Sequence, residues 1–239
     1  MKEKRMNKSS YHFFTEASAN KTKLLAVLID PDNFDITKSA SFLNNLPIDA
    51  THLLVGGSNV EDGKTTHLVS EIKKYSKLPL LLFPGDVSQI TNKADGLLFL
   101  SLLSGRNPEY LIGQQVKAVS KLRNSTIDVL STGYILIDGG NKSSVERVSK
   151  TQPMPQNNIQ AIVDTAMAGE LLGKQLIYLE AGSGAKYPVQ EDIISAVKKE
   201  INIPLIVGGG IKTEKQKQEA YLAGADMVVM GTVFENINL

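Results

Sequence analysis

Residues 175–184 read QLIYLEAGSG and combine the two features from which the fold can be predicted. The first half is a short, almost continuously apolar run, whereas the second half is an acidic residue followed by closely spaced glycines. A run of about five apolar residues without polar alternation is typical of a strand buried on both faces of a parallel sheet. Glu180 and the glycines after it therefore lie at the C-terminal end of a predicted strand.

Apolar segments of the same kind recur along almost the whole chain and alternate with helical patterns. The predicted strands are residues 24–29, 51–55, 78–83, 97–102, 127–130, 175–179, 203–207 and 227–230. Apolar residues spaced three and four apart predict helices over residues 34–46, 61–76, 108–122, 157–172, 189–200 and 213–223. This alternation predicts an α/β fold, a single (β/α)8 TIM barrel. An open doubly wound sheet is the alternative, but it more often divides into two halves, and no Pro/Ser-rich linker divides this chain.

Two segments do not fit the regular alternation of a barrel. Residues 85–95 carry only a weak and short helical pattern, so we expect the third helix to be replaced by a loop-like segment. Residues 139–157 are expected to form a loop-like insertion after the fifth strand. We expect one TIM-barrel domain over residues 1–239, with residues 1–22 as an N-terminal extension or helix that packs on the barrel.

The composition excludes several classes of protein. Hydrophobic residues make up 42% and charged residues 21% of the 239 residues, which is typical of a globular chain rather than a disordered one. With 26 basic and 25 acidic residues the net charge is +1, so no overall positive field favours nucleic acid as a partner. The chain has no cysteine, which excludes disulfides, thiolate metal sites and a cysteine nucleophile. Because no apolar run approaches the roughly 20 residues of a transmembrane segment and the start lacks the apolar core of a signal peptide, we expect a cytoplasmic protein.

Glycine clusters follow the predicted strands at their C-terminal ends, the face on which barrel enzymes carry their active sites. A single cluster could merely permit a tight turn, because glycine adopts positive φ without strain. Clusters after the sixth, seventh and eighth strands together favour a phosphate site, since backbone N–H groups without side chains can approach an anion there. The residues of this predicted site are Gly182, Ser183, Gly184, Gly208, Gly209, Gly210, Gly231 and Thr232.

Four side chains beside these clusters are candidates for chemistry. Asp30 ends the first strand and Ser58 follows the second, so both could supply oxygen ligands to Mg²⁺ at the barrel mouth. Alternatively, Asp30 caps a turn and Ser58 is a turn residue. A carboxylate at Glu180 can act as general base toward a substrate hydroxyl, the alternative being a salt bridge to a lysine. Tyr178 either fills the core or reaches a ligand phosphate with its hydroxyl.

The histidines do not form a recognisable site. His12, His52 and His67 are scattered and lack the spacing of a metal-binding motif, so we expect them in packing or on the surface. No Ser-His-Asp arrangement and no dinucleotide-binding glycine motif is evident. A serine-hydrolase or dinucleotide-binding function is therefore not expected.

Five motifs in these segments resemble those of the geranylgeranylglyceryl phosphate synthase family, to which the bacterial heptaprenylglyceryl phosphate synthases are closely related. They are residues 28–32 (LIDPD), 55–58 (VGGS), 178–185 (YLEAGSGA), 207–211 (VGGGI) and 231–235 (GTVFE). The motifs keep their order on successive strands, and the resemblance extends over most of the chain. The string YLEAGSG is the most specific of them.

The resemblance implies a fold, a reaction and a set of site residues. The fold is a modified TIM barrel without the third helix, and the reaction joins the prenyl group of geranylgeranyl diphosphate to the 3-hydroxyl of sn-glycerol 1-phosphate in ether phospholipid biosynthesis. By the same resemblance, Asp30 and Ser58 match Mg²⁺ positions, and Glu180 matches the residue that receives the hydroxyl proton. The positions that match the glycerol phosphate site are Tyr178, Leu179, Glu180, Ala181, Gly182, Ser183, Gly184, Gly208, Gly209, Gly210, Gly231 and Thr232.

Further expectations concern partners and alternatives. Around Glu180 the sequence is more similar to the geranylgeranyl branch, and within it to a second subgroup, which implies a homo-oligomer, a dimer or hexamer. A lipid product implies contact with a membrane surface when it is released. The alternatives are a heptaprenylglyceryl phosphate synthase with a longer donor, a phosphosugar-type barrel isomerase, and a non-catalytic barrel that binds a phosphorylated ligand. An isomerase would need a second acid/base group opposite Glu180, and none is evident in the sequence.

Overall fold

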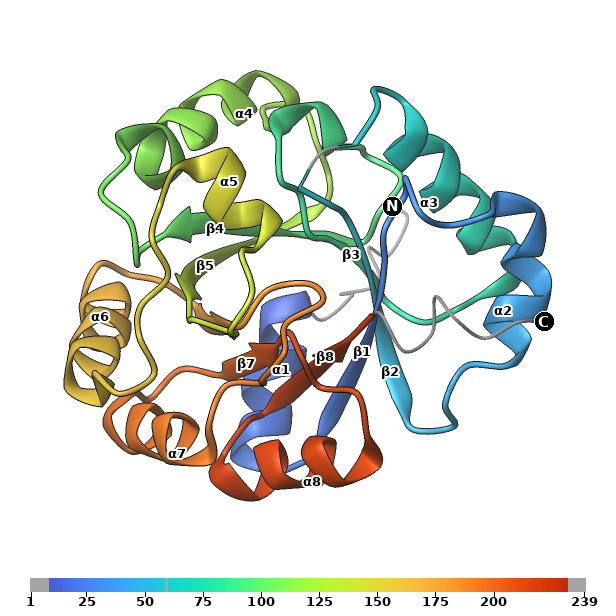
Figure 1. Ribbon diagram of the computed structural model, residues 1–239. Helices are drawn as coiled ribbons and strands as arrows, with labels where there is room; N and C mark the ends of the chain where they lie inside the picture. The colour runs from blue at the N-terminus through green and yellow to red at the C-terminus, as the bar shows by residue number, and fades with distance from the viewer. Residues whose placement is uncertain (1–8, 59, 232–239) are drawn as a thin grey trace, which may run out of the picture.

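Eight parallel strands close into a barrel in chain order, with β8 pairing back to β1 (Figure 1). The computed structural model describes residues 9–58 and 60–231. The strands are β1 Leu24–Ile29, β2 Ala50–Val55, β3 Leu80–Leu82, β4 Gly96–Leu102, β5 Asp128–Leu136, β6 Leu176–Glu180, β7 Leu205–Gly208 and β8 Met227–Met230. The predicted (β/α)8 barrel is confirmed.

Helices surround the barrel on the outside, and each of the six predicted helices is found, beginning one to three residues later than predicted (Figure 1). They are η1 Ile36–Lys38 with α2 Ser39–Asn44, α3 Lys64–Tyr75, the π-turn η3 Glu109–Gly113 with α4 Gln114–Leu122, α6 Ile159–Leu171, α7 Glu191–Glu200 and α8 Glu214–Ala223. The first of them divides because the side chain of Asp35 accepts a hydrogen bond from the Thr37 N–H and starts a separate 3-10 turn.

The third helix of the barrel is replaced by a short segment, as the sequence predicts. Between β3 and β4 the structure has only the 3-10 turn η2, Val87–Gln89, which the side chain of Asp86 caps by accepting from the Ser88 N–H at 2.8 Å. Pro84 and Gly85 precede it and do not favour a longer helix. The barrel is therefore covered only thinly between α3 and α4.

Two predictions about the fifth strand and the loop after it were wrong. β5 continues to Leu136 instead of ending at residue 130, because Ser131, Thr132 and Gly133 interrupt the apolar run but not the strand. The hydroxyl of Thr132 is satisfied within the strand by donating to the Leu130 carbonyl at 2.8 Å. The expected loop 139–157 contains the short helix α5, Ser144–Ser149, whose N-terminus Ser143 caps by accepting from the Glu146 N–H.

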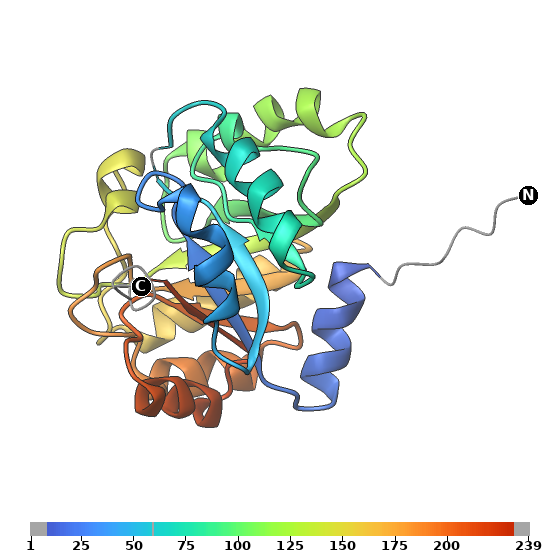
Figure 2. The ribbon, with the colours of Figure 1, turned by 90° about the vertical axis from the view of Figure 1, so that its right-hand side faces the viewer.

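The helix α1, Ser10–Ala19, lies across the N-terminal end of the barrel (Figure 2). Its Phe14 is fully buried and belongs to the same apolar cluster as the side chains that fill the barrel. Two other clusters lie between the sheet and the helices. With one end closed by α1, only the C-terminal end of the barrel is accessible to a ligand. No helix in residues 9–58 and 60–231 has the length and apolar character needed to cross a membrane.

Candidate active site

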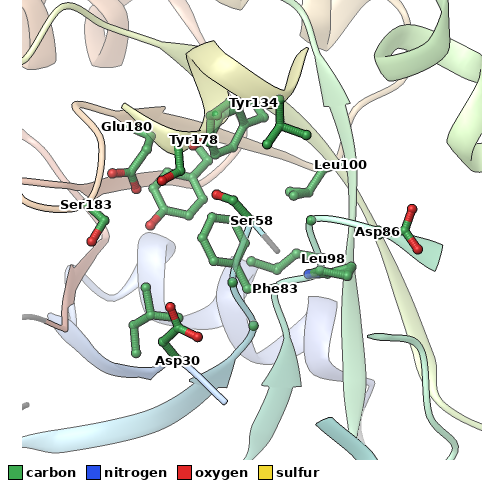
Figure 3. A pocket seen from close by; sticks show the side chains of 18 of the residues that line it. Asp30, Ser58, Phe83, Asp86, Leu98, Leu100, Tyr134, Tyr178, Glu180 and Ser183 are labelled. Atoms are coloured by element: carbon green, nitrogen blue, oxygen red, sulfur yellow. The ribbon is translucent and has the colours of Figure 1, made fainter. Parts of the chain in front are cut away.

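A cavity of about 480 Å³ opens at the C-terminal end of the barrel and extends outward toward α4. Its polar end is lined by the loops after β1, β2, β6, β7 and β8, and its apolar arm by β4, η2, α4 and α5. Figure 3 shows Glu180 and Ser183 on one side of this cavity and Leu98 and Leu100 on the other. The predicted strand ends thus converge on one cavity.

Glu180 is the last residue of β6 and its side chain lies in the polar end of the cavity. Strand alternation places Tyr178 and Glu180 on the inner face of the barrel. Glu180 is 5% exposed, and its Oε1 accepts a hydrogen bond from the Gly182 N–H at 2.7 Å. Burial raises the pKa of Glu180, an effect that the Tyr178 hydroxyl and the Gly182 N–H offset in part. A carboxylate with a raised pKa is a better proton acceptor than an ordinary one.

Three aromatic rings form the floor beneath Glu180. Phe83 stacks on Tyr178 with ring centroids 5.2 Å apart, and Tyr134 meets Tyr178 edge-on at 5.5 Å. The Tyr178 hydroxyl is buried beside Glu180 without reaching hydrogen-bond geometry to any described residue. Burial and the nearby Glu180 charge raise the pKa of Tyr178, so its hydroxyl stays protonated and able to donate. Tyr178 therefore both packs in the core and faces the cavity.

The loops after β6 and β7 present unpaired backbone donors to the cavity. In the part of the chain that the structure describes, the N–H groups of the cavity-lining residues Ser183, Gly209 and Gly210 donate no hydrogen bond to protein atoms. Gly209 has φ of 78°, and a Cβ there would lie 2.3 Å from Glu180 Oε1. A side chain at this position would therefore displace the carboxylate. Bare N–H groups at a loop of this kind suit an anion such as phosphate.

The structure divides the predicted substrate-site residues into two groups. Those that line the cavity are Tyr178, Glu180, Ser183, Gly209, Gly210 and Gly231. The side chains of Leu179 and Ala181 pack in the layer between sheet and helices, so only their main chain is near the ligand space. Gly182, Gly184 and Gly208 support the loops without lining the cavity, and Thr232 lies outside the described residues.

The two predicted metal ligands, Asp30 and Ser58, both line the cavity (Figure 3). Asp30 accepts hydrogen bonds from the Asp32 N–H and the Asn33 side chain, both at 3.0 Å, and burial raises its pKa. A Cβ on Gly57 would lie 2.8 Å from Asp30 Oδ1, so the loop that carries Ser58 packs directly against this carboxylate.

These residues fit Mg²⁺ only as part of a joint site with a ligand. Within the described residues no cluster of three or more His, Asp or Glu side chains could hold a metal ion by itself. Mg²⁺ in phosphate-transferring sites takes one or two carboxylates and completes its shell with water and substrate phosphate oxygens. One carboxylate, Asp30, with a hydroxyl, Ser58, meets that requirement beside a bound phosphate.

The apolar arm of the cavity was not predicted residue by residue. Leu98 and Leu100 of β4 line it from the barrel side, and Val145 and Val148 of α5 line it from above. It occupies the side of the barrel where the third helix is missing. The signal available in the sequence was the alternate apolar residues of β4, but the distant α5 could not be assigned to the same surface from local pattern.

Several site residues were missed by sequence reasoning. Tyr134 was missed because β5 was expected to end before it, and Phe83 was read only as part of an apolar strand. Gln89 is buried and holds the loop of Ser58 by exchanging two hydrogen bonds with the main chain of Gly57, at 2.7 and 3.3 Å. No local pattern marks Gln89, because its role depends on a contact with a residue 32 positions away.

Comparisons with known proteins agree with these features. A sequence model described as the PcrB family matches residues 18–238. The chain is 56% identical over 221 residues to the geranylgeranylglyceryl phosphate synthase of Zunongwangia profunda, which covers 92% of this chain and 94% of that protein. It is 40% identical over 217 residues to the protein of the same name from Thermococcus kodakarensis, covering 89% and 84%. The resemblance seen in the motifs is thereby confirmed.

A solved structure extends the similarity to three dimensions. It is the crystal structure of (S)-3-O-geranylgeranylglyceryl phosphate synthase from Thermoplasma acidophilum in complex with its substrate sn-glycerol-1-phosphate. The two chains are 34% identical and superpose with a TM-score of 0.89 over 95% of this chain and 92% of that one. The two chains therefore share the overall barrel fold.

Proposed function

The chain belongs to the PcrB family, and from that premise we propose that it is a prenyltransferase that joins geranylgeranyl diphosphate to the 3-hydroxyl of sn-glycerol 1-phosphate. The names of its relatives support this class of reaction, and the related Thermoplasma acidophilum enzyme binds sn-glycerol-1-phosphate. The observation that carries the proposal is one cavity with a buried carboxylate, Glu180, between unpaired backbone donors and an apolar arm.

The glycerol phosphate binds at the polar end of this cavity. Its phosphate accepts hydrogen bonds from the free N–H groups of the loops after β6 and β7. Glu180 lies at the base of the same loops, so the glycerol carbon chain extends from the phosphate toward the carboxylate. Anchoring the phosphate in this way holds the 3-hydroxyl in an oriented position instead of relying on a chance encounter.

The prenyl diphosphate takes the rest of the cavity. Its hydrocarbon chain lies in the apolar arm against Leu98, Leu100, Val145 and Val148, where it would displace water. Its diphosphate lies at the barrel mouth near Asp30 and Ser58, which would hold Mg²⁺ together with the diphosphate oxygens. When bound, Mg²⁺ neutralises the charge that develops on the departing diphosphate.

Transfer then needs one proton acceptor. The glycerol oxygen attacks the first carbon of the prenyl chain, the bond from that carbon to the diphosphate oxygen breaks, and the hydroxyl proton passes to Glu180. The raised pKa of Glu180 suits this role. The cavity floor is formed by the aromatic rings of Phe83, Tyr134 and Tyr178. These rings would exclude water from the reacting centre and so protect a positively charged allylic centre from capture by water.

The direct test is an assay of the purified protein with Mg²⁺ and prenyl diphosphates of graded length. We expect an ether product with sn-glycerol 1-phosphate and none with its 3-phosphate enantiomer, with highest kcat/KM for the geranylgeranyl donor. A preference for the heptaprenyl donor would change the assigned chain length. Failure to form ether with any donor would reject prenyl transfer and leave the isomerase or the non-catalytic phosphate-binding barrel.

A further inference from the structure

The side chains that line the cavity are strongly unbalanced in charge. Four of them are carboxylates, Asp30, Asp32, Asp86 and Glu180, whereas Lys212 is the single lysine or arginine among the described lining residues. Both proposed substrates are anions, and an anion that enters a site lined by carboxylates needs a cation beside it. Mg²⁺ at Asp30 would serve the diphosphate, which leaves the glycerol phosphate to be neutralised.

Lys212 lines the cavity beside the loops at which that phosphate would bind. It follows Gly210 by two residues in the loop before α8, and its Nζ donates to the Ala185 carbonyl at 3.0 Å in the loop after β6. The ammonium group thus bridges the two loops that carry the unpaired N–H groups. The Lys212 N–H donates to Gln216 Oε1 at 2.8 Å. Gln216 in turn forms the capping box of α8 with Thr213.

Lys64 lies near the cavity without lining it and is already paired with acidic side chains. Lys64 lies 3.0 Å from Asp32 and 3.1 Å from Glu61 in ion pairs. Lys212 forms no ion pair with a described residue, and its partner is a neutral carbonyl. A phosphate dianion attracts the ammonium group through its full negative charge, whereas the carbonyl offers only a dipole, so a bound phosphate would displace Ala185 as the partner of Lys212.

We propose that Lys212 binds the phosphate of sn-glycerol 1-phosphate and supplies the positive charge that the backbone cradle lacks. This inference rests on the proposed function for the identity of the ligand. The phosphate is not altered in the reaction, so its contact with Lys212 is the same in ground state and transition state. Lys212 is therefore a binding residue, and its loss raises KM for glycerol phosphate while leaving kcat nearly unchanged.

The test compares Lys212→Gln with Lys215→Gln as a matched control. Lys215 lies on α8 three positions further on, is largely exposed and pairs with Glu219 at 3.5 Å. For Lys212→Gln we expect KM for sn-glycerol 1-phosphate to rise about tenfold or more, the cost of losing a hydrogen bond to a charged group. KM for the prenyl diphosphate and kcat should change less than about twofold. Lys215→Gln should match the wild type, and Lys212→Arg should restore most of the affinity.

Calorimetric titration with sn-glycerol 1-phosphate, without prenyl donor, gives a second readout that does not need turnover. The dissociation constant for Lys212→Gln should rise by the same factor as KM, with unchanged thermal unfolding. An unchanged dissociation constant, or a rise in KM for the prenyl diphosphate alone, would overturn the inference. If the wild type makes no ether product but binds glycerol phosphate through Lys212, the proposed function fails while the assignment of Lys212 stands.

Discussion

Glu180 and Asp30 show how burial prepares single side chains for different tasks. Both carboxylates line one cavity, and burial raises the pKa of each. Glu180 accepts one hydrogen bond from the Gly182 N–H of its own loop, and the Tyr178 hydroxyl lies beside its carboxylate. Asp30 accepts hydrogen bonds at both oxygens from the turn that follows it, which fixes the orientation of its side chain. The chemistry of the site therefore depends on the immediate surroundings of two residues.

Glu180→Gln should lose at least about a hundredfold in kcat, the usual contribution of a general base, while the affinity for sn-glycerol 1-phosphate changes little. The proposed base, Glu180, accepts a proton only when it is deprotonated, and its pKa lies above the ordinary 4.5. The rate should therefore fall with decreasing pH at a higher pH than an exposed glutamate would give. The pH profile of kcat/KM measures this directly. Near-normal turnover of the variant would remove Glu180 from the role of base.

Asp30→Ala should lower the apparent affinity for Mg²⁺ and reduce kcat/KM by at least about a hundredfold, because the departing diphosphate loses several kcal/mol of charge stabilisation. Binding of sn-glycerol 1-phosphate should stay the same. The measurement is a titration of activity with Mg²⁺ after treatment with a chelator. As a control, Asp35→Ala changes an exposed carboxylate that caps η1 and should leave the metal dependence intact. An unchanged Mg²⁺ requirement in Asp30→Ala would place the ion elsewhere.

At the scale of elements, short segments take over tasks that a regular barrel gives to helices. η2 is only three residues long, yet its buried Gln89 is bonded to the main chain of the loop that carries Ser58. α1 closes the opposite end of the barrel. There the rings of Phe13 and Phe14 pack against the ring of His52, with centroid distances of 5.1 and 5.5 Å. The packing of α1 thus places the ionisable ring of His52 in an apolar environment.

His52 should make the stability of the protein depend on pH. Burial lowers its pKa from 6.5 to about 4, so between these values the unfolded chain binds a proton that the folded one does not. Stability contributed by the neutral ring is present above pH 6.5 and is lost as the pH falls toward 4. As the pH falls from about 7.5 to about 5, protonation of His52 in the unfolded chain should lower the free energy of unfolding by about 2 kcal/mol.

Chemical denaturation of His52→Phe measures that contribution. The phenyl ring keeps the contacts with Phe13 and Phe14 but carries no proton, so the variant should lose about 2 kcal/mol less than the wild type over the same pH range. His67→Gln changes an exposed histidine of α3 and should behave as the wild type. Equal losses in wild type and His52→Phe would show that α1 does not shield His52 from water.

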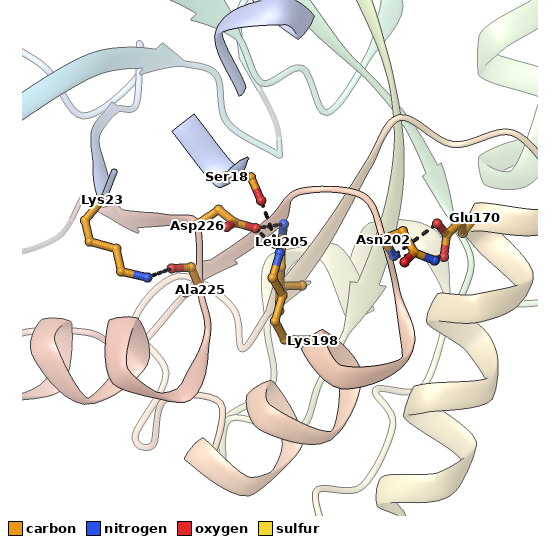
Figure 4. A network of polar contacts seen from close by, with 8 residues as sticks. All are labelled: Ser18, Lys23, Glu170, Lys198, Asn202, Leu205, Ala225 and Asp226. Atoms are coloured by element: carbon orange, nitrogen blue, oxygen red, sulfur yellow. Dashed lines mark hydrogen bonds and ion pairs between the residues drawn. The ribbon is translucent and has the colours of Figure 1, made fainter. Parts of the chain in front are cut away.

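For the whole molecule, the two ends of the barrel are specialised. The cavity lies at the C-terminal end, and a network of ionic and polar contacts lies at the N-terminal end (Figure 4). There Asp226 accepts from Lys198 Nζ at 2.6 Å and from the Leu205 N–H at 2.7 Å, and Lys198 also donates to Ser18 of α1. These contacts join β7, β8, α7 and α1 where the barrel closes.

Asp226→Ala should therefore destabilise the protein without affecting the chemistry. Asp226 is buried, and its removal leaves both Lys198 and the Leu205 N–H without this partner, so we expect a loss of about 3 kcal/mol in unfolding free energy. Below its unfolding temperature the variant should keep the kcat and KM of the wild type. Glu219→Gln, which removes an exposed pair with Lys215, should cost less than about 1 kcal/mol. A large change in kcat for Asp226→Ala would contradict the separation of the two ends.

The oligomeric state and membrane contact implied by the family resemblance stay predictions at this scale. A dimer or hexamer would be detected by sedimentation velocity of the full chain. Co-sedimentation with lipid vesicles, with and without ether product, would detect release at a membrane surface.

The sequence by itself determined the barrel and the positions of its principal polar residues. Apolar runs and helical periodicity are local properties, and in a closed parallel barrel all strand ends meet, so Asp30, Ser58, Glu180 and Gly209 had to converge. The missing third helix was equally local, because residues 85–95 have too weak a helical pattern. These features follow from neighbours in the chain.

Only the tertiary structure decided which surfaces face one another. Three contacts of the site join residues from different elements. Phe83 stacks on Tyr178, Gln89 donates a hydrogen bond to the Gly57 carbonyl, and Lys212 donates one to the Ala185 carbonyl. The continuation of β5 through Ser131, Thr132 and Gly133 likewise depends on pairing with its neighbours β4 and β6, which overrides a weak local pattern. Such contacts are selected by packing and hydrogen bonding across long sequence separations, which no local spacing encodes.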